Sequence, residues 1–186
     1  YATENWTYAN GNIDEGVEFS VVCAPEGYTY VPDDNFEQAL IDLGYDNTLD
    51  DFVLTANISG AASLNISQEG IGDLTGIEAF TALTTLECYS NSLTTLDLSA
   101  NTALTTLDCQ GNQLTSLDVS ANTALTYLMC VGNQLTSLDV SNNTALTYLQ
   151  CGDNLLTSLD VSSNTALTEL GCTENQLTSL DMSANT

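Results

Sequence analysis

A period of 21 residues runs through the C-terminal half of this 186-residue chain and constrains its fold more than any other feature. Five copies of the general form LTxLxCxxNxLTSLDVSxNTA follow one another, starting at Leu83, Leu104, Leu125, Leu146 and Leu167. A degenerate copy of 22 residues, residues 61–82, precedes them. Because a unit this short cannot bury an apolar face alone, tandem copies predict a solenoid in which each coil packs on its neighbours.

Each copy also predicts one short strand followed by a turn. Two leucines and a cysteine alternate with polar residues, which is typical of a strand with one buried face. The asparagine after them stands where the coil turns, and its amide can pair with backbone groups of the next coil. These asparagines are Asn91, Asn112, Asn133, Asn154 and Asn175. The pattern LxxLxCxxNxL is the leucine-rich-repeat signature.

The signature predicts an α/β solenoid, a right-handed leucine-rich-repeat coil with short parallel β-strands on its concave face and a mostly irregular convex side. A small N-terminal cap with one helix is expected before the repeats. We divide the chain into an N-terminal arm or strand (residues 1–30), a helical cap (residues 31–60) and the solenoid (residues 61–186). The arm includes an alternating stretch, residues 17–23, that predicts a strand.

The stretch PDDNFEQALIDLG predicts the helix of the cap. Asp34 is the expected N-cap, and Gly44 is the expected C-terminal stop. Phe36, Leu40 and Leu43 recur at helical spacing, so we expect them to share one buried face. Such a helix would cover the apolar end and the unpaired strand edge of the first coil.

The charge composition excludes several classes of function. The chain has 25 acidic residues and no Lys, Arg or His. Without side-chain cations it lacks a surface for nucleic acid or anionic lipid, and without His it lacks an imidazole base and His metal ligands. No apolar run approaches the ~18 residues of a membrane helix, so we expect no membrane insertion. We also expect no enzyme, because a shallow solenoid face encloses no pocket around the carboxylates of Glu87 and Asp108.

Five of the six cysteines follow the repeat period. They are Cys88, Cys109, Cys130, Cys151 and Cys172. Free cysteine packs as a small apolar side chain, so the favoured interpretation is a ladder of buried thiols. Neighbouring Cα atoms ~4.8 Å apart would suit a disulfide, but side chains that point the same way oppose that bridge. A line of thiolates cannot surround one metal ion.

The positions that vary between copies point outward from the predicted strands, as expected of a binding face on a fixed scaffold. Tyr127, Met129, Val131 and Tyr148 form an apolar, aromatic patch in the middle of the stack, and such patches often mark interfaces. An incidental surface that drifts neutrally would show the same variation. The candidate binding residues are Tyr89, Gln110, Tyr127, Met129, Val131, Tyr148, Gln150 and Glu169.

Acidic residues offer candidate sites for calcium, and no other cofactor is expected. An Asp recurs once per repeat, and further acidic residues lie in the loop after the cap helix. Each repeat Asp is expected to accept backbone N–H bonds in a turn. Alternatively the column binds Ca²⁺, which prefers oxygen ligands. The candidate ligands are Asp46, Asp50, Asp97, Asp118, Asp139 and Asp160.

Four Asn-x-Ser/Thr sequons are acceptor motifs for N-glycosylation. They start at Asn5, Asn57, Asn65 and Asn142. In a chain rich in Asn and Thr several such motifs arise by chance, so modification stays open.

From Tyr30 to Thr186 the chain resembles the secreted leucine-rich-repeat proteins of flavobacteria and their relatives. The resemblance rests on VPDDNFEQALIDLG, IGDLTGIEAFTALTTL and the LDCQGNQLTSLDVSANTA units. It implies a non-enzymatic extracellular or cell-surface protein that works through protein–protein or glycan interaction. The alternative is a structural subunit that stacks head-to-tail into an extracellular filament, because an uncapped last coil would accept a neighbour.

Overall fold

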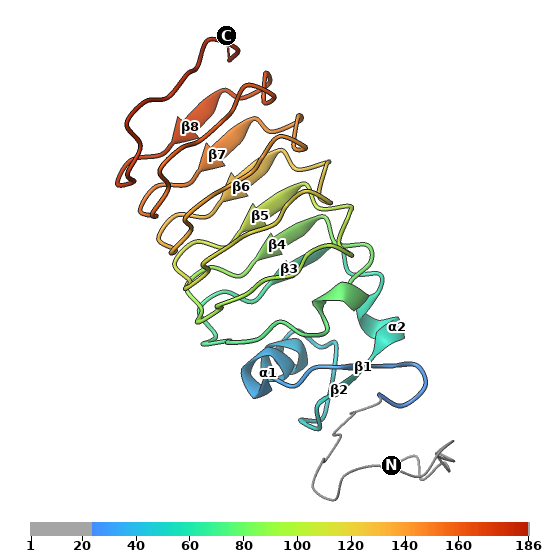
Figure 1. Ribbon diagram of the computed structural model, residues 1–186. Helices are drawn as coiled ribbons and strands as arrows, with labels where there is room; N and C mark the ends of the chain where they lie inside the picture. Colours follow the sequence, from blue (N-terminus) through green and yellow to red (C-terminus); the bar gives the residue numbers. More distant parts are fainter. Residues whose placement is uncertain (1–23, 186) are drawn as a thin grey trace, which may run out of the picture.

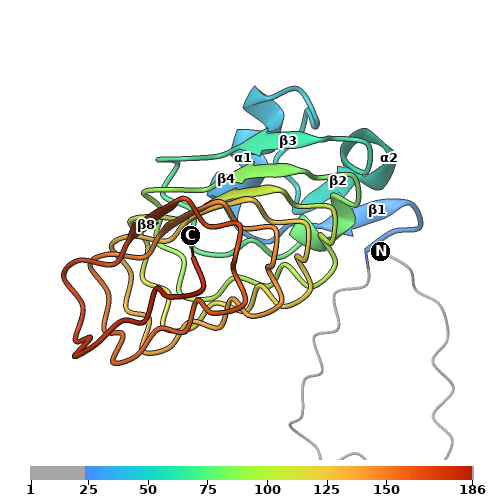
Figure 2. The same ribbon diagram turned by 90° about the horizontal axis from the view of Figure 1, so that it is seen from above.

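The computed structural model describes residues 24–185, which form a stack of coils with a small cap at the N-terminal end (Figure 1). Each coil contributes one short strand to a six-stranded parallel sheet in which the strands follow chain order. The strands are β3 (Ser63–Asn65), β4 (Thr85–Glu87), β5 (Thr106–Asp108), β6 (Tyr127–Met129), β7 (Tyr148–Gln150) and β8 (Glu169–Gly171). Seen along the stack, the coils surround a common core and the sheet occupies one side (Figure 2). The predicted leucine-rich-repeat solenoid is confirmed.

Apolar columns fill the space between the sheet and the return segments. The middle residue of each strand points inward, so Leu107 and Leu128 are paired in register and fully buried. The cysteine two residues after each of these leucines is also buried, and Leu114 and Val119 continue the core on the return side. A buried leucine contributes about 1.5–3 kcal/mol. Because the leucines of one coil are buried by the neighbouring coils, the columns stabilise the fold only when the coils are stacked.

The predicted asparagine column forms a ladder inside the turn after each strand. The Nδ2 of Asn112 donates to the carbonyls of Cys88 and Cys109, at 3.0 Å each. Its Oδ1 accepts the N–H of Leu93 in the preceding coil at 3.0 Å. Equivalent bonds are made by Asn91, Asn133, Asn154 and Asn175. Each amide therefore bonds backbone groups of two coils, and the carbonyls of Cys88 and Cys109 each accept from two successive asparagines.

A second asparagine ladder, not predicted from the sequence, runs down the return side. The Nδ2 of Asn122 donates to the carbonyls of Leu98 and Asn101, at 3.1 and 2.9 Å. Equivalent bonds are made by Asn101, Asn143, Asn164 and Asn185. The signal that marks this ladder is the Asn of the SxNT segment, which is unchanged in all five copies.

The cap consists of a hairpin and two helices. Its elements are β1 (Tyr28–Tyr30), α1 (Asp34–Asp42), β2 (Phe52–Leu54) and α2 (Thr55–Ile58). β1 and β2 pair antiparallel, and Phe36 of α1 stacks on Phe80 of the first coil with ring centroids 6.4 Å apart. A 3-10 helix, η1 (Ile77–Ala79), lies in the return segment of that coil. The one-turn helix α2 was not predicted, because four residues are too few to show a periodic pattern.

Asp33 joins the cap helix to the first coil. Its Oδ1 caps α1 by accepting the N–H groups of Asn35 and Phe36, at 3.0 Å each. Its Oδ2 accepts the N–H groups of Gly72 and Asp73, at 2.8 and 3.0 Å. One carboxylate therefore satisfies two helix donors and two donors of the solenoid.

The boundaries of α1 correct two predictions and confirm a third. Asp34, the predicted N-cap, is instead the first residue of the helix. Leu43 does not share the buried face of Phe36 and Leu40: it is 48% exposed, because it is the C-cap, where the chain leaves the helix. Gly44 is confirmed as the stop, with a left-handed φ of 80° that glycine adopts without strain.

Glu37 is a fully buried carboxylate that anchors the loop after α1. Its Oε1 accepts the N–H groups of Asp50 and Phe52, at 2.9 and 3.1 Å, and its Oε2 accepts that of Asp51 at 3.0 Å. These bonds compensate for the burial of the charge. The loop is thereby held against the cap helix.

The described part of the predicted arm contains β1, which pairs with β2 of the cap. The predicted strand over residues 17–23, Cys23 and the sequon at Asn5 lie outside the described residues. Between residues 24 and 185, no helix is long and apolar enough to cross a membrane.

Candidate binding face

The outer face of the sheet carries the residues that differ from coil to coil. The first and third residues of each strand point away from the core, so both stay partly exposed in β4 to β7 while the middle leucine is buried. Five of the predicted binding residues lie on three adjacent strands: Tyr127, Met129, Tyr148, Gln150 and Glu169. The other three follow a strand by two residues: Tyr89, Gln110 and Val131.

Tyr127 and Tyr148 form a stacked aromatic pair at the centre of this face. They are partners in the register of β6 and β7, and their ring centroids are 4.3 Å apart with an interplanar angle of 4°. The spacing follows from the distance of about 4.8 Å between neighbouring strands, which places side chains in register one above the other. Partial burial, and then the neighbouring Tyr148, Asp108 and Glu169, raise the pKa of Tyr127 to about 12. The hydroxyl of Tyr127 therefore stays neutral at physiological pH.

Two carboxylates lie beside the aromatic pair. Asp108 of β5 is half-buried and is the register partner of Glu87 on one side and of Met129 on the other. The backbone N–H and the Nε2 of Gln110 donate to Asp108, at 3.2 Å each. Partial burial raises the pKa of Asp108, and the nearby Glu87 adds to this rise while Gln110 lowers it. The Asp108 carboxylate is thus less well solvated than an exposed one.

The side-chain size changes at the C-terminal end of the face. Gly171 of β8 has no side chain, and the amide of Gln150 lies in the space that a Cβ at this position would occupy. Gln150 and Gly171 are partners in register. The side chain of Gln150 is therefore directed along the stack toward β8.

The repeat cysteines form the predicted column of free thiols. Cys88, Cys109, Cys130 and Cys151 are buried, and Cys172 in the last coil is half-buried. Burial raises the pKa of Cys109 and of Cys151 to about 12, so these thiols stay protonated at physiological pH. Buried, protonated thiols are poor nucleophiles and poor metal ligands.

The repeat aspartates are exposed and bonded within their own turns. The Oδ1 of Asp118 accepts the N–H of Ser120 at 2.9 Å. The same bond recurs at Asp97, Asp139, Asp160 and Asp181. Hydrogen bonding by that serine lowers the pKa of each aspartate. The turn interpretation of these residues is confirmed, and calcium binding by the column stays a prediction.

The loop after α1 brings the other calcium candidates together. One carboxylate oxygen from each of Glu37, Asp46 and Asp50 lies within 4.8 Å of the others. Both oxygens of Glu37 already accept backbone N–H bonds of this loop. Calcium at Asp46 and Asp50 therefore stays a prediction as well.

The described sequons differ in the hydrogen bonds that their asparagine side chains make. The Nδ2 of Asn57 donates to the carbonyl of Tyr45 at 2.8 Å, and that of Asn65 donates to the Glu87 carboxylate at 2.6 Å. The Nδ2 of Asn142 makes only a long bond of 3.5 Å to the carbonyl of Ser120. Asn142 is therefore the acceptor whose modification would disturb least.

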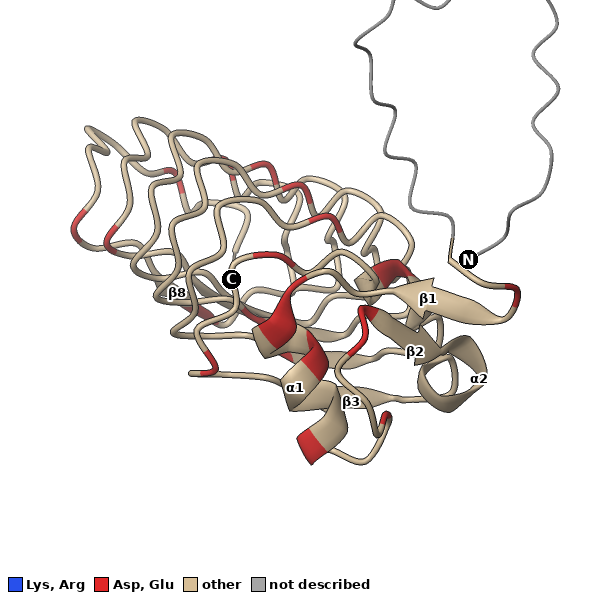
Figure 3. Cartoon of the chain, turned by 90° about the horizontal axis from the view of Figure 1, so that it is seen from below, with Lys and Arg blue, Asp and Glu red and all other residues tan. Residues whose placement is uncertain are grey.

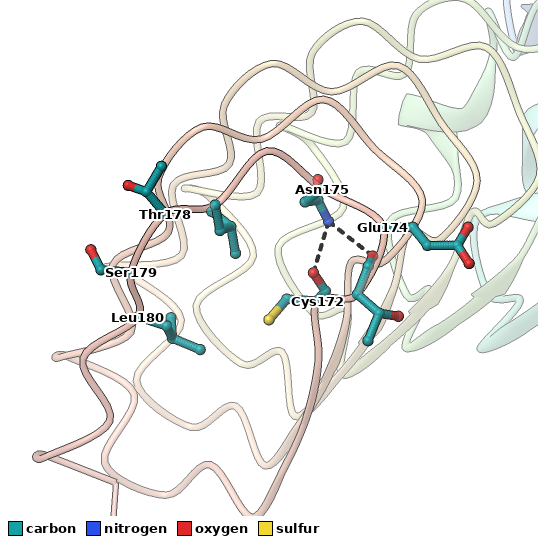
Figure 4. A pocket seen from close by; sticks show the side chains of 8 residues that line it. Cys172, Glu174, Asn175, Thr178, Ser179 and Leu180 are labelled. Carbon is teal, nitrogen blue, oxygen red and sulfur yellow. Dashed lines mark hydrogen bonds between the residues drawn. The ribbon is translucent and has the colours of Figure 1, made fainter.

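A pocket of about 370 Å³ lies in the last coil (Figure 4). Its walls include Leu177, Leu180 and Asn175, whose Nδ2 donates to the carbonyls of Cys172 and Thr173. The equivalent apolar side chains of interior coils are covered by the following coil. This pocket lies on the last described coil, and its lining does not include the tyrosine pair.

The repeats, ladders and cap together define a leucine-rich-repeat solenoid. The chain is similar to internalin J of Listeria monocytogenes serotype 4b (strain F2365), with 47% identity over 72 residues, or 39% of this chain and 8% of internalin J. A solved structure of the functional domain of internalin J from Listeria monocytogenes, described as including a cysteine ladder, matches with a TM-score of 0.78 and 46% identity. The match covers 84% of this chain and 36% of that chain.

Other solved structures share the fold. Internalin C2 of Listeria monocytogenes has a TM-score of 0.63 at 22% identity, covering 87% of this chain and 84% of that chain. A leucine-rich-repeat protein of Leptospira interrogans has a TM-score of 0.54 at 27% identity, covering 57% of this chain and 29% of that chain. No family model matches the chain. These relatives are bacterial leucine-rich-repeat proteins, while the flavobacterial type stays a prediction.

Proposed function

We propose that this chain is a non-enzymatic module, extracellular or on the cell surface, that binds a protein or glycan partner through the outer face of β5 to β7. The observation that carries the proposal is the stacked pair of Tyr127 and Tyr148. The pair lies where residues vary between coils, on a scaffold fixed by two asparagine ladders. Tyrosine is enriched at protein interfaces, because it combines a large apolar area with a polar tip.

The similarity to internalin J supports this assignment at the level of the fold and the cysteine column. The chain spans 36% of the solved internalin J domain. Any activity of the whole relative is therefore extended to this chain only as part of the proposal. The buried thiols argue against a catalytic role for the cysteine column, since their pKa values are raised by burial. Binding through the strand face needs only the exposed side chains.

An array of purified extracellular protein domains and glycans, probed with the labelled chain, tests the proposal. The variant Tyr127→Ala/Tyr148→Ala should bind any ligand of the wild-type chain at least about tenfold more weakly, as expected for interface hot spots. The matched control is Thr115→Ala/Thr136→Ala, at exposed positions outside the strands, and it should bind as the wild type does. Unchanged binding by the tyrosine variant to every ligand would refute the proposal.

The alternative function is a subunit that stacks head-to-tail into an extracellular filament. The N-terminal end of a second copy is already contacted by its own cap, through Asp33 and Phe36. A neighbour would therefore dock on the cap and not on a free coil. Negative-stain microscopy separates the two functions, since regular filaments support stacking and single short particles support the binding module.

A further inference from the structure

Asp108, a carboxylate on the binding face, is less well compensated than the exposed aspartates that recur once per repeat. The chain contains no Lys, Arg or His. In Figure 3 the described part of the chain accordingly carries Asp and Glu (red) and no Lys or Arg (blue). The exposed repeat aspartates are stabilised by water and by short bonds of 2.9 Å to a serine N–H. Asp108 is half-buried, and its bonds to Gln110 are longer, at 3.2 Å. A cation from outside the chain would compensate this charge.

The tyrosine pair lies beside this carboxylate on the same face of the sheet. Tyr127 and Tyr148 cover each other's inner faces. Because the two rings are parallel, the other face of the Tyr127 ring lies on the side of β5, where its register partner is the much smaller Thr106. Asp108 lies two residues further along the same strand. An aromatic ring and a carboxylate therefore lie on neighbouring strands of the same face.

We propose that the ligand of this face is a basic segment of a partner protein, in which an arginine stacks on the outer face of Tyr127 and bonds the carboxylate of Asp108. This inference rests on the proposed function and specifies the chemistry of the ligand. A guanidinium suits this combination of ring and carboxylate because it is planar, stacks on aromatic rings and donates two parallel bonds to one carboxylate. It would also offset the repulsion between Asp108 and Glu87, which are neighbours in register.

Fluorescence anisotropy with a labelled peptide of alternating Arg and Gly tests the proposal on the whole chain. The control peptide carries citrulline, which has nearly the shape of arginine without its charge. We expect the Arg peptide to bind more tightly, with an affinity that falls as salt is added. Asp108→Asn keeps one acceptor oxygen for the backbone N–H of Gln110 but removes the charge, and should weaken binding about tenfold. Asp118→Asn removes the same charge from an exposed turn and should change the affinity less than about twofold.

Three results would overturn the inference. They are no binding of the Arg peptide, equal binding of the Arg and citrulline peptides, and equal weakening by Asp108→Asn and Asp118→Asn, which would indicate attraction by net charge alone. None of them affects the proposed function, because a neutral glycan or an apolar protein surface could still bind the tyrosine pair. The proposed function fails only when Tyr127→Ala/Tyr148→Ala binds every array ligand as the wild type does.

Discussion

At the residue scale, asparagine side chains supply hydrogen bonds to backbone groups that regular helices and strands would otherwise pair. Outside its short strand, each coil buries backbone N–H and C=O groups that have no strand partner. The asparagine side chain supplies two donors and an acceptor at a fixed reach, so one residue can join two coils. Asn133 illustrates this, since it donates to the carbonyls of Cys109 and Cys130 and accepts the N–H of Leu114. The constancy of the repeat asparagines is thus a requirement of the backbone.

Asn133→Ala should destabilise the chain, because the buried N–H of Leu114 loses its acceptor, while the carbonyls of Cys109 and Cys130 keep the bonds from Asn112 and Asn154. We expect the free energy of unfolding to fall by about 1–3 kcal/mol, the cost of one unpaired buried group. Urea unfolding measures the change. Asn142→Ala is the control: its one bond is 3.5 Å long, and the loss should stay within about 0.5 kcal/mol. Equal effects of the two variants would contradict the role of the ladder.

The cysteine column should make stability depend on pH in the alkaline range. Burial raises the pKa of Cys109 and of Cys151 from 9.0 to about 12. The folded state therefore keeps protons that the unfolded chain releases above pH 9, so the stability is full below pH 9.0 and falls as the pH rises toward 12. Urea midpoints across this range measure the fall, which should be shallower in Cys109→Ala. The same slope in both proteins would argue against a buried, protonated Cys109.

At the element scale, α1 and the first coil act as one unit, because Asp33 bonds both. Its carboxylate accepts two N–H groups of the helix and two of the coil. The cap therefore gives the first coil polar partners that interior coils receive from their neighbours. Adjacent Asp34 lies in the first turn of α1 and is exposed, so the two residues form a matched pair for mutation.

Asp33→Ala should cost about 1–2 kcal/mol of unfolding free energy, mainly from the lost N-cap, because the exposed donors of Gly72 and Asp73 can bond to water instead. Asp34→Ala should cost less than about 1 kcal/mol, from its favourable position near the helix N-terminus. Thermal unfolding compares the two variants. Hydrogen exchange at the amides of Gly72 and Asp73 should accelerate in Asp33→Ala alone. Equal exchange in both variants would mean that Asp33 does not join the two elements.

The elements that could be predicted from the sequence are those with a periodic apolar pattern. The strands follow from alternating leucine and cysteine, and the core of α1 follows from Phe36 and Leu40. The N-cap was misplaced because Asp33 and Asp34 are chemically identical, and only the contact with Gly72 distinguishes them. Leu43 was misplaced because helical spacing says nothing about where the helix ends.

The candidate face was predictable in outline only. A fixed repeat length places Tyr127 beside Tyr148 on neighbouring strands, so their proximity follows from the sequence. The half-burial of Asp108 and the position of Gln150 over Gly171 depend on side-chain rotamers and on the size of neighbouring residues. Such details follow from packing between coils and leave no pattern within one repeat.

At the scale of the whole molecule, the solenoid is a sum of coils that contact only their neighbours. Removal of one interior repeat should therefore leave a shorter folded stack with a smaller urea m-value, because less surface is exposed on unfolding.

Deletion of residues 83–103 keeps the tyrosine pair, whereas deletion of residues 125–145 removes Tyr127. We expect both proteins to fold, and only the second to lose ligand binding. Loss of binding in the first would mean that the tyrosine pair is not sufficient.

The central claim is that a partner binds on the strand face, and hydroxyl-radical footprinting tests it most directly. This reaction oxidises Tyr and Met side chains that solvent reaches, so it can be compared in the free chain and in a complex with an array ligand. We expect the ligand to protect Tyr127, Met129 and Tyr148 and to leave Tyr28, which is 45% exposed on the cap, unchanged. Protection of Tyr28 with unchanged oxidation of Tyr127 and Tyr148 would contradict the account.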